Sequence, residues 1–373
     1  MNGKKWILAA VIVILMALAA GAGWMIARLS LPVYEAEATT DLETDQQLRN
    51  PISAPAFEEA LALAGESVTT RAASAPATVL SAEQAGTAPA AAETQPTSRP
   101  LANGSNADAL ADFDKGIALL KNDPIGARYA LSEALLSGKL PQQQEAKAME
   151  ELTKLSEDTI LSGSIVEDDP YTFYYMIEPG DVLARLERRL ELHVPWQILL
   201  KINQIDRPED IKVGQRMKMI RGPFHAVVSK SNFTMDIFLH RETLPRVWVA
   251  RIKCGLGKNG STPVGMWRVG GGEGKRGGKL VHPTWNPPPS SITQGPINYG
   301  QEGYALGSKG LWIGLVGTDE NTVSAQNYGI HSTSNQSSIG KEESLGCIRL
   351  ADNAIELAYS LLYEVWSTVQ TRE

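Results

Sequence analysis

Apolar side chains recur at helical spacing along residues 107–161, where they form three successive series. Pro124 and Pro141 stand where helices should begin, because proline suits the first turn of a helix. The pattern predicts two or three packed helices over residues 104–165, arranged as an antiparallel hairpin with tetratricopeptide-like spacing. One or two such units are fewer than a solenoid needs, so the hairpin is either a spacer or a module that docks a partner.

Residues 171–221 follow a different order of elements. A short strand precedes a Pro-Gly turn, a second helix is predicted at 195–202, and alternating faces at 211–219 indicate a closing strand. We expect Asp181 to cap a first helix that begins at Val182, because a carboxylate accepts hydrogen bonds from the free N–H groups there. The segment is therefore predicted to be a small β-α-α-β module.

From residue 222 to residue 373 the pattern changes to short runs of alternating polarity, separated by Gly, Pro and Asn. Such runs are typical of a β-rich domain. The clearest of them lie at 224–228, 234–239, 246–253 and 266–269. The whole chain is thus predicted to be multidomain, with a mainly-β domain that follows the helical hairpin and the β-α-α-β module.

The segment 1–31 contains an uncharged run at 6–27, directly after Lys4 and Lys5. At about 1.5 Å rise per residue, a helix of this length spans roughly 30 Å of membrane hydrocarbon. The lysines before it and the acidic residues after it predict a cytoplasmic N-terminus. We favour a retained single-pass anchor in the inner membrane over a cleaved signal peptide, because the run exceeds an ordinary signal core. Both alternatives place the remaining chain outside the cytoplasm, in the periplasm.

Residues 32–103 are rich in Ala, Pro, Ser, Thr and Glu and poor in aromatic side chains. Such a composition buries too little apolar surface to offset its conformational entropy, so we predict a disordered tether. Residues 31–100 hold ten acidic and three basic side chains, which accounts for the net charge of −7, since the rest balances at 32 against 32. A balanced folded region lacks the basic footprint of a nucleic-acid-binding protein.

Histidine and cysteine are scarce, and their spacing argues against metal binding. The five histidines form no HExxH pair, and the two cysteines form no CxxC pair. We therefore expect no metal site and no cofactor.

His331 lies sixteen residues before Cys347 (347 minus 331), and Cys347 follows a glycine. A cysteine in this setting can expose its sulfur as a nucleophile beside main-chain N–H groups that bind an oxyanion. A nearby imidazole lowers the pKa of a thiol and populates the thiolate near neutrality. The residues alone leave two alternatives open: an inert, buried Cys347, or a disulfide between Cys254 and Cys347.

The combination resembles the YkuD family of L,D-transpeptidases, whose signature is a His followed at this distance by Ser/Thr-His-Gly-Cys and then Arg. The matching positions are His331, Ser344, Gly346, Cys347 and Arg349. The segments 262–265, 305–308 and 312–315 resemble further parts of the family pattern. Two positions depart from it, because Leu345 replaces a second His and Ser332 replaces a Gly. The resemblance implies an L,D-transpeptidase-like β-sandwich or barrel over residues 222–373.

The resemblance also implies a reaction. Cys347 attacks a peptidoglycan tetrapeptide, D-Ala leaves, and the resulting thioester is resolved by an acceptor amine to give a 3→3 cross-link. His331 moves the protons, and carbapenems are expected to acylate Cys347.

The neighbouring residues have implied roles as well. Gly346, Ser344 and Ser332 are assigned to oxyanion and substrate contacts, with the Ser332 carbonyl orienting the His331 ring. Arg349 either holds a stem carboxylate or forms a structural ion pair.

The β-α-α-β module resembles LysM modules, which bind glycans that contain N-acetylglucosamine. The landmarks that carry this resemblance are Gly180, Asp181, Asn203, Gly214 and Gln215. They mark the fold and identify no sugar contacts. The resemblance implies a module that holds the protein on peptidoglycan, and the alternative is a structural adaptor without a sugar groove.

Three functions stay open at this point. The leading one is an exported, cross-linking L,D-transpeptidase whose partners are peptidoglycan stem peptides, glycan strands and the membrane. The second is a catalytically weak peptidoglycan-binding scaffold, in which Leu345 marks decay of the activity. The third is an L,D-carboxypeptidase or amide hydrolase that uses the same cysteine with a different acceptor. The sequence does not specify the oligomeric state.

Overall fold

The computed structural model describes residues 105–241, 243–270, 278–287 and 295–373. The predicted anchor at 1–31 and the predicted tether at 32–103 lie outside the described residues. Within the described part of the chain, no helix combines the length and the apolar character needed to cross a membrane.

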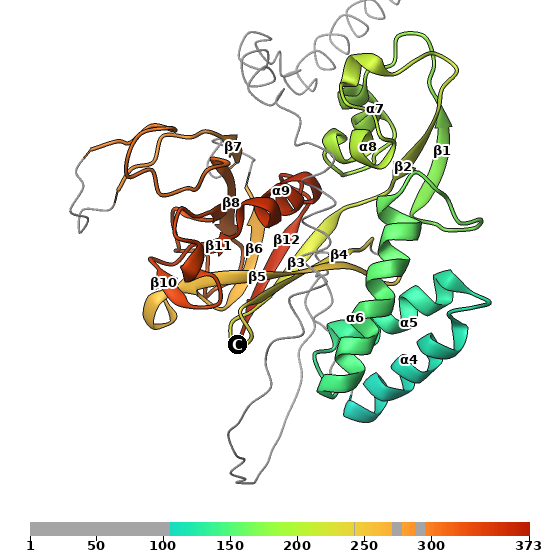
Figure 1. The fold of residues 1–373 in the computed structure, drawn as a ribbon, viewed down its shortest axis with the longest axis horizontal. Coiled ribbons are helices and arrows are strands. Elements are labelled where there is room, and N and C mark those ends of the chain that lie inside the picture. The colour runs from blue at the N-terminus through green and yellow to red at the C-terminus, as the bar shows by residue number, and fades with distance from the viewer. Residues whose placement is uncertain (1–104, 242, 271–277, 288–294) are drawn as a thin grey trace, which may run out of the picture. The chain divides into compact units, whose positions relative to one another are not determined.

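Three α-helices open the described chain (Figure 1): α4 (Asn106–Leu119), α5 (Pro124–Leu136) and α6 (Gln142–Ser156), with a π-helical turn at Glu157–Leu161. Ser105 caps α4, because its side chain accepts a hydrogen bond from Asp108 N–H while the Asp108 carboxylate accepts one from Ser105 N–H. Pro124 is the first residue of α5, and Pro141 is the N-cap residue of α6. Both prolines therefore lie where their fixed φ angle suits a helix start.

A β-α-α-β unit follows: β1 (Thr172–Met176), α7 (Leu183–Arg189), α8 (Trp196–Ile202), a 3-10 turn at Pro208–Asp210 and β2 (Arg216–Ile220), with β1 and β2 antiparallel. Gly180 adopts φ +84° in the turn after β1. The Asn203 amide ties the end of α8 to β2, since it donates to the Lys218 carbonyl and accepts from Lys218 N–H. The order of elements is that of the predicted module, whose identity as a LysM module stays a prediction.

Asp181 does not cap α7, contrary to expectation. Val182 is the N-cap residue and makes no side-chain cap hydrogen bond. The Asp181 carboxylate instead accepts hydrogen bonds from Glu178 N–H at 2.8 Å and from the Tyr175 hydroxyl at 2.9 Å. It also pairs with Arg189 at 2.9 Å. Tyr175 and Glu178 lie on the β1 side of the turn, whereas Arg189 is the last residue of α7. The carboxylate therefore closes the turn and pairs with the C-terminal end of α7 instead of capping its start.

The predicted β-rich domain is confirmed as a barrel-like sheet. Its strands are β3 (Phe224–Ser229), β4 (Thr234–Leu239), β5 (Val247–Gly257), β6 (Gly265–Val269), β7 (Lys279–Val281), β8 (Leu311–Gly317), β9 (Tyr328–Ser332), β10 (Glu342–Ser344), β11 (Ile348–Leu350) and β12 (Thr368–Arg372), with 3-10 turns at Lys258–Gly260 and Gln336–Ser338. The order β10-β5-β11-β9-β8-β6-β12-β3-β4 closes on itself, because β4 also pairs with β5, while β7 pairs with β8. Helix α9 (Asp352–Leu361) packs against β8 and β9 (Figure 1).

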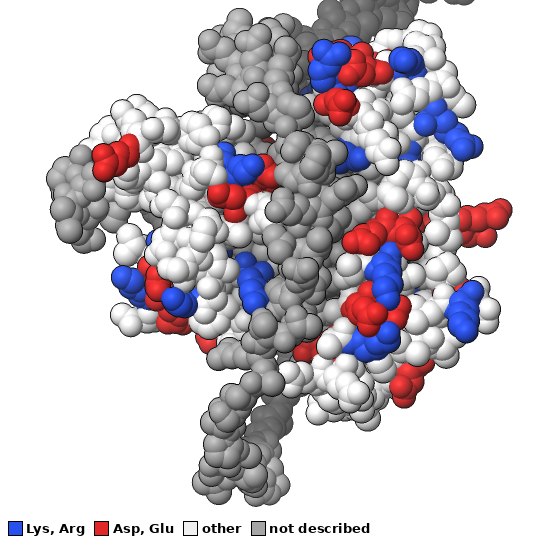
Figure 2. Space-filling view, in the orientation of Figure 1, with Lys and Arg blue, Asp and Glu red and all other residues white. Residues whose placement is uncertain are grey.

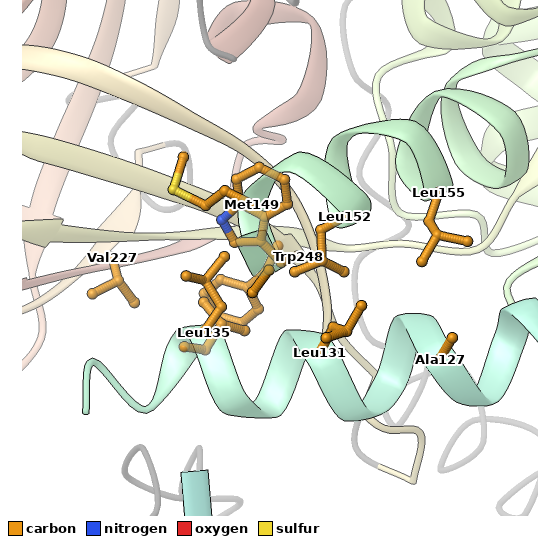
Figure 3. Close-up of a cluster of buried hydrophobic side chains, with 11 residues drawn as sticks. Ala127, Leu131, Leu135, Met149, Leu152, Leu155, Val227 and Trp248 are labelled. Atoms are coloured by element: carbon orange, nitrogen blue, oxygen red, sulfur yellow. The ribbon is translucent and has the colours of Figure 1, made fainter. Parts of the chain in front are cut away.

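The three N-terminal helices share a hydrophobic core with the β domain. Figure 3 shows Leu131 and Leu135 of α5 and Leu152 of α6 gathered around Trp248 of β5, with Val227 of β3 at one side. Trp248 is only 1% exposed, because the helices cover the face of β5 from which its side chain projects. Since removal of this apolar surface from water stabilises both units together, the helices and the sheet form one folded body.

Ion pairs surround this shared core. The Arg251 guanidinium of β5 binds Asp236 of β4 at 2.7 Å and also pairs with Glu145 of α6. Arg246, just before β5, pairs with Glu133 of α5. These side chains are partly or fully shielded from water, where an unpaired charge would be unfavourable. The helices are therefore held on the sheet by ion pairs as well as by apolar contacts, and the choice between a spacer and a partner-docking module stays open.

The exposed side of α6 also carries ion pairs, in which Lys147 and Lys154 contact Glu150 and Glu151. Figure 2 shows basic and acidic side chains interspersed in the same way over the visible face of the described residues. Mixed charges of this kind produce no strong single-sign field on that face.

We predict that Leu152→Ala lowers the free energy of unfolding by about 2–5 kcal/mol, because truncation of a fully buried side chain leaves a cavity in the shared core. Urea denaturation followed by circular dichroism measures the change. The matched control is Val323→Ala, at a side chain 67% exposed, which should change this free energy by less than about 0.5 kcal/mol. Equal stabilities of the two variants would contradict a core shared by helices and sheet.

Candidate active site

Parallel pairing of β9 with β11 places the two predicted catalytic residues at neighbouring strands. Ile348 lies opposite Ile330, and Arg349 lies opposite His331. Cys347 directly precedes β11, and the Gly329 main chain hydrogen-bonds to its sulfur. Since side chains alternate between the faces of a strand, Cys347 and Arg349 share the face on which His331 lies. The Arg349 charge accordingly acts on both the His331 imidazole and the Cys347 thiol.

A tight turn before β11 presents Cys347. The Ser344 hydroxyl donates to the Cys347 carbonyl at 2.6 Å and accepts from Gly346 N–H at 3.0 Å. Ser344 is 2% exposed, so its hydroxyl is used within the turn. The prediction that Ser344 contacts the oxyanion or the substrate therefore gives way to a role in shaping the turn.

Gly346 has φ +134°, a conformation that side chains strongly disfavour. A Cβ atom at this position would lie 2.7 Å from the Tyr328 ring and 3.1 Å from the Ser261 carbonyl oxygen. The Gly346 carbonyl accepts a hydrogen bond from the Thr262 hydroxyl at 2.8 Å. Only glycine fits here, and its N–H, engaged by the Ser344 hydroxyl, is not free to bind an oxyanion.

The His331 ring is held in one orientation. Its Nδ1 lies 2.5 Å from the Ser332 carbonyl oxygen. Because a carbonyl only accepts, Nδ1 carries the proton, and Nε2 is left as the basic nitrogen. Trp312 of β8 stacks on the imidazole with a centroid distance of 5.6 Å, and the Ser332 hydroxyl donates to the Leu306 carbonyl at 2.7 Å. The expected contact of His331 with the Ser332 carbonyl is thus present, although serine replaces glycine.

Burial sets the protonation states of this pair. It lowers the pKa of His331 to about 4, an effect that the Ser332 hydrogen bond opposes and the Arg349 charge reinforces. It raises the pKa of the Cys347 thiol to about 11, against the smaller lowering effects of the Gly329 main chain and Arg349. Both shifts favour the neutral forms at pH 7, a protonated thiol and an uncharged imidazole. They oppose the expected thiolate near neutrality, which stays a prediction.

The Cys347 sulfur donates to the Asn327 carbonyl at 3.7 Å. Asn327 has φ +61°, a left-handed conformation that asparagine tolerates better than most residues. Among the described residues, this carbonyl rather than the His331 ring accepts the thiol proton in the structure. A rotation of the Cys347 side chain is thus part of any transfer of its proton to His331.

Arg349 is half-buried beside the cysteine, and burial lowers its pKa. Its Nε is buried and has no hydrogen-bond partner among the described residues. Glu343 acts on it electrostatically, yet no carboxylate of the described chain lies within ion-pair distance of Arg349. Of the two alternatives for Arg349, the structural ion pair is not formed with any carboxylate of residues 105–241, 243–270, 278–287 and 295–373.

Leu345 and Cys254, which also stood out in the sequence, make no contact with the Cys347 thiol or the His331 ring that the structure records. Leu345, where the family pattern has a second His, is 67% exposed. Cys254 lies opposite Leu350 in the sheet, is fully buried, and has a pKa raised by that burial. Both cysteines are free thiols, so the alternative of a Cys254–Cys347 disulfide is wrong.

Three residues that the structure brings to the site, Trp312, Thr262 and Asn327, had no predicted role. Trp312 and Thr262 belong to segments that match the family pattern, yet neither was expected to touch the His331 ring or the nucleophile turn. Asn327 lies just before β9, and no motif or pattern in the sequence pointed to a role for it. No group of His, Cys, Asp and Glu side chains in the described part of the chain is arranged to hold a metal ion.

Comparison with protein families agrees with this geometry. Residues 223–369 match the model of the YkuD family, described as the L,D-transpeptidase catalytic domain. This segment is a YkuD domain. The match begins one residue before β3 and ends within β12, so it contains Cys347, His331 and all of the barrel strands except the end of β12.

Solved structures similar to this chain include an L,D-transpeptidase from Mycobacterium smegmatis, with 14% identity and a TM-score of 0.29 over 43% of this chain and 65% of that one. L,D-transpeptidase 3 from Mycobacterium tuberculosis, in complex with a faropenem-derived adduct, has 15% identity and a TM-score of 0.29 over 43% of this chain and 66% of that one. The present chain thus spans slightly less than two thirds of these two structures. No curated protein matches it.

The YkuD domain should show a steep pH dependence of thiol reactivity. With the pKa of Cys347 near 11, the thiolate fraction rises about tenfold per pH unit between pH 7 and pH 10, so the rate of alkylation by iodoacetamide should rise with it. Mass spectrometry of the labelled protein measures the rate, and Cys347→Ser, which should stay unlabelled, is the control. A rate that is already constant from pH 6 upward would indicate a preformed thiolate and contradict this account.

Proposed function

We propose that this protein is an exported peptidoglycan L,D-transpeptidase in which Cys347 is the nucleophile and His331 the general base. One observation carries the proposal. In a YkuD domain, the His331 ring is fixed through Nδ1 on the Ser332 carbonyl, and the neighbouring strand presents Cys347 on the same face. This arrangement suits acyl transfer to sulfur.

Acylation begins from the neutral pair. The Cys347 proton passes to His331 Nε2 as the sulfur attacks the donor carbonyl between the third stem residue and the terminal D-Ala. The low pKa of His331 limits how far the imidazolium accumulates, so proton transfer and attack take place together. The carbon–nitrogen bond then breaks, the D-Ala amine takes the proton from His331, and a thioester remains on Cys347.

Deacylation reverses the proton movements. His331 takes a proton from the acceptor amine as the amine attacks the thioester carbonyl, and the proton passes to the departing sulfur. The product is a 3→3 cross-link. The energy of the original amide bond is conserved in the thioester, so no nucleotide is required, which suits a reaction outside the cytoplasm.

Arg349 is proposed to bind a carboxylate of the stem peptide. Its half-buried guanidinium lies on the catalytic face and makes no ion pair with a described carboxylate. A planar cation with unused donors suits bidentate binding of a carboxylate. The exposed Leu345 leaves His331 as the one imidazole of the family pair, so a single base serves both half-reactions.

The remaining parts of the proposal concern location. The apolar segment at 6–27 would anchor the chain in the inner membrane, and residues 32–103 would let the folded part reach the wall. The β-α-α-β unit would act as a LysM module, because a second weak contact with glycan strands raises the effective concentration of stem peptides near Cys347. The partners would be stem peptides and glycan strands of peptidoglycan.

We expect Cys347→Ala to reduce release of D-Ala from tetrapeptide stems by more than about a thousandfold, because no other side chain supplies the nucleophile. Chromatographic assay of D-Ala from purified muropeptides measures the loss. Cys254→Ala is the matched control, since it removes the buried thiol that takes no part, and it should retain the activity. If the wild-type protein and Cys347→Ala release D-Ala equally slowly, the scaffold alternative replaces the enzyme.

Mass analysis of the products separates the two enzymatic alternatives. Cross-linked dimers joined through the third stem residues support transpeptidation. Tripeptide stems without dimers, formed in the presence of acceptor, would instead identify an L,D-carboxypeptidase that uses the same thioester.

A further inference from the structure

We infer that Thr262 is a positioning residue for acyl transfer, whose hydroxyl aims the Cys347 N–H at the oxygen of the reacting carbonyl. The inference rests on the proposed use of Cys347 as an acyl acceptor. It adds a residue from the loop between β5 and β6 that touches neither the sulfur nor the imidazole.

Both hydrogen-bonding directions of the Thr262 hydroxyl are fixed. Its oxygen accepts from Gly257 N–H at 2.8 Å, and its own proton goes to the Gly346 carbonyl at 2.8 Å. Thr262 is 2% exposed, so water does not compete for these bonds. A fully used, buried hydroxyl holds its acceptor in a single direction.

The acceptor belongs to the peptide bond that carries the Cys347 N–H. This bond is trans, since the cis bond among the described residues is Gly222–Pro223. In a trans peptide the C=O and the N–H point in opposite directions. When Thr262 holds the Gly346 carbonyl, the Cys347 N–H therefore points away from Thr262.

Gly346 itself does little to define this orientation. It has φ +134° and no side chain, so its own conformational preference is weak. A Cβ atom on Gly346 would meet the Tyr328 ring and the Ser261 carbonyl oxygen, so both lie close to the turn, and the Tyr328 hydroxyl donates to the Ser261 carbonyl at 3.1 Å. The segment that carries Thr262 is thus held against the turn, and Thr262 supplies the hydrogen bond that sets the peptide plane.

The Cys347 N–H is important because the preceding N–H, that of Gly346, is already used in another hydrogen bond. Gly346 N–H donates to the Ser344 hydroxyl at 3.0 Å. When the Cys347 sulfur attacks a carbonyl, an oxyanion forms close to this turn and needs a main-chain hydrogen-bond donor there. The next N–H in the chain after that of Gly346 is the Cys347 N–H. A donor aimed in advance at a developing oxyanion stabilises the transition state more than the ground state.

The test compares acylation of Cys347 with its alkylation in the full chain. Acylation by p-nitrophenyl acetate passes through an oxyanion, whereas alkylation by iodoacetamide does not. Thr262→Val keeps the shape of the side chain and removes the hydroxyl, so we expect acylation to slow by about ten- to a hundredfold, while alkylation changes by less than about twofold. Thr262→Ser restores the hydroxyl and should recover most of the acylation rate.

Thr172→Val is the matched control, because it removes a buried hydroxyl that bonds to Asp169, in the β-α-α-β unit. It should change neither rate. Equal acylation rates for wild type and Thr262→Val, or equal slowing of acylation and alkylation, would overturn the inference, since the latter result means that the sulfur rather than the N–H has moved. Thermal denaturation confirms that each variant is folded at the assay temperature.

These reagents require no peptidoglycan. A wild-type protein that acylates with p-nitrophenyl acetate yet releases no D-Ala from stem peptides contradicts the proposed function and leaves the role of Thr262 to be decided by the variants.

Discussion

The pairing of β9 with β11 is the constraint on which the site depends. Two short strands with Ile348 opposite Ile330 place the proposed nucleophile, Cys347, and the proposed base, His331, on one face of a closed sheet. A shift of one residue in this register would turn the Cys347 side chain to the opposite face. The fully buried side chains of Ile330 and Ile348 oppose such a shift, because it would expose apolar surface. Packing of the barrel core therefore keeps Cys347 and His331 on the same face of the sheet.

Burial has a second consequence at the same place. The half-buried thiol and the buried imidazole both favour their neutral forms. In the proposed mechanism the proton therefore stays on the sulfur until a substrate binds. An uncharged cysteine is less reactive toward electrophiles in general than a thiolate. The preorganised parts are the imidazole, held between Ser332 and Trp312, and the turn, held by Ser344 and Thr262.

The sequence predicted the parts of this structure that have local causes. Alternation of polar and apolar residues located β4 with its exact bounds, and proline located the starts of α5 and α6. The closing strand of the β-α-α-β unit begins at Arg216 rather than at 211, because Lys212 and Gln215 bond to each other in a turn. The pKa values, the Thr262 contact and the packing of the helices on Trp248 depend on residues far apart in the chain, and no local pattern encodes them.

The central claim is that one sulfur atom, Cys347 Sγ, takes up an acyl group, and trapping that acyl group tests it most directly. The protein is incubated with a carbapenem, whose strained lactam carbonyl acylates the thiol. The resulting acyl group is transferred only slowly to an acceptor, so the adduct can be detected from the intact mass and located by mass analysis of a digest. The account predicts an increase by one carbapenem per chain, located on the peptide that contains Cys347 and absent from Cys347→Ala. An unmodified protein, or an adduct on any other residue, would contradict it.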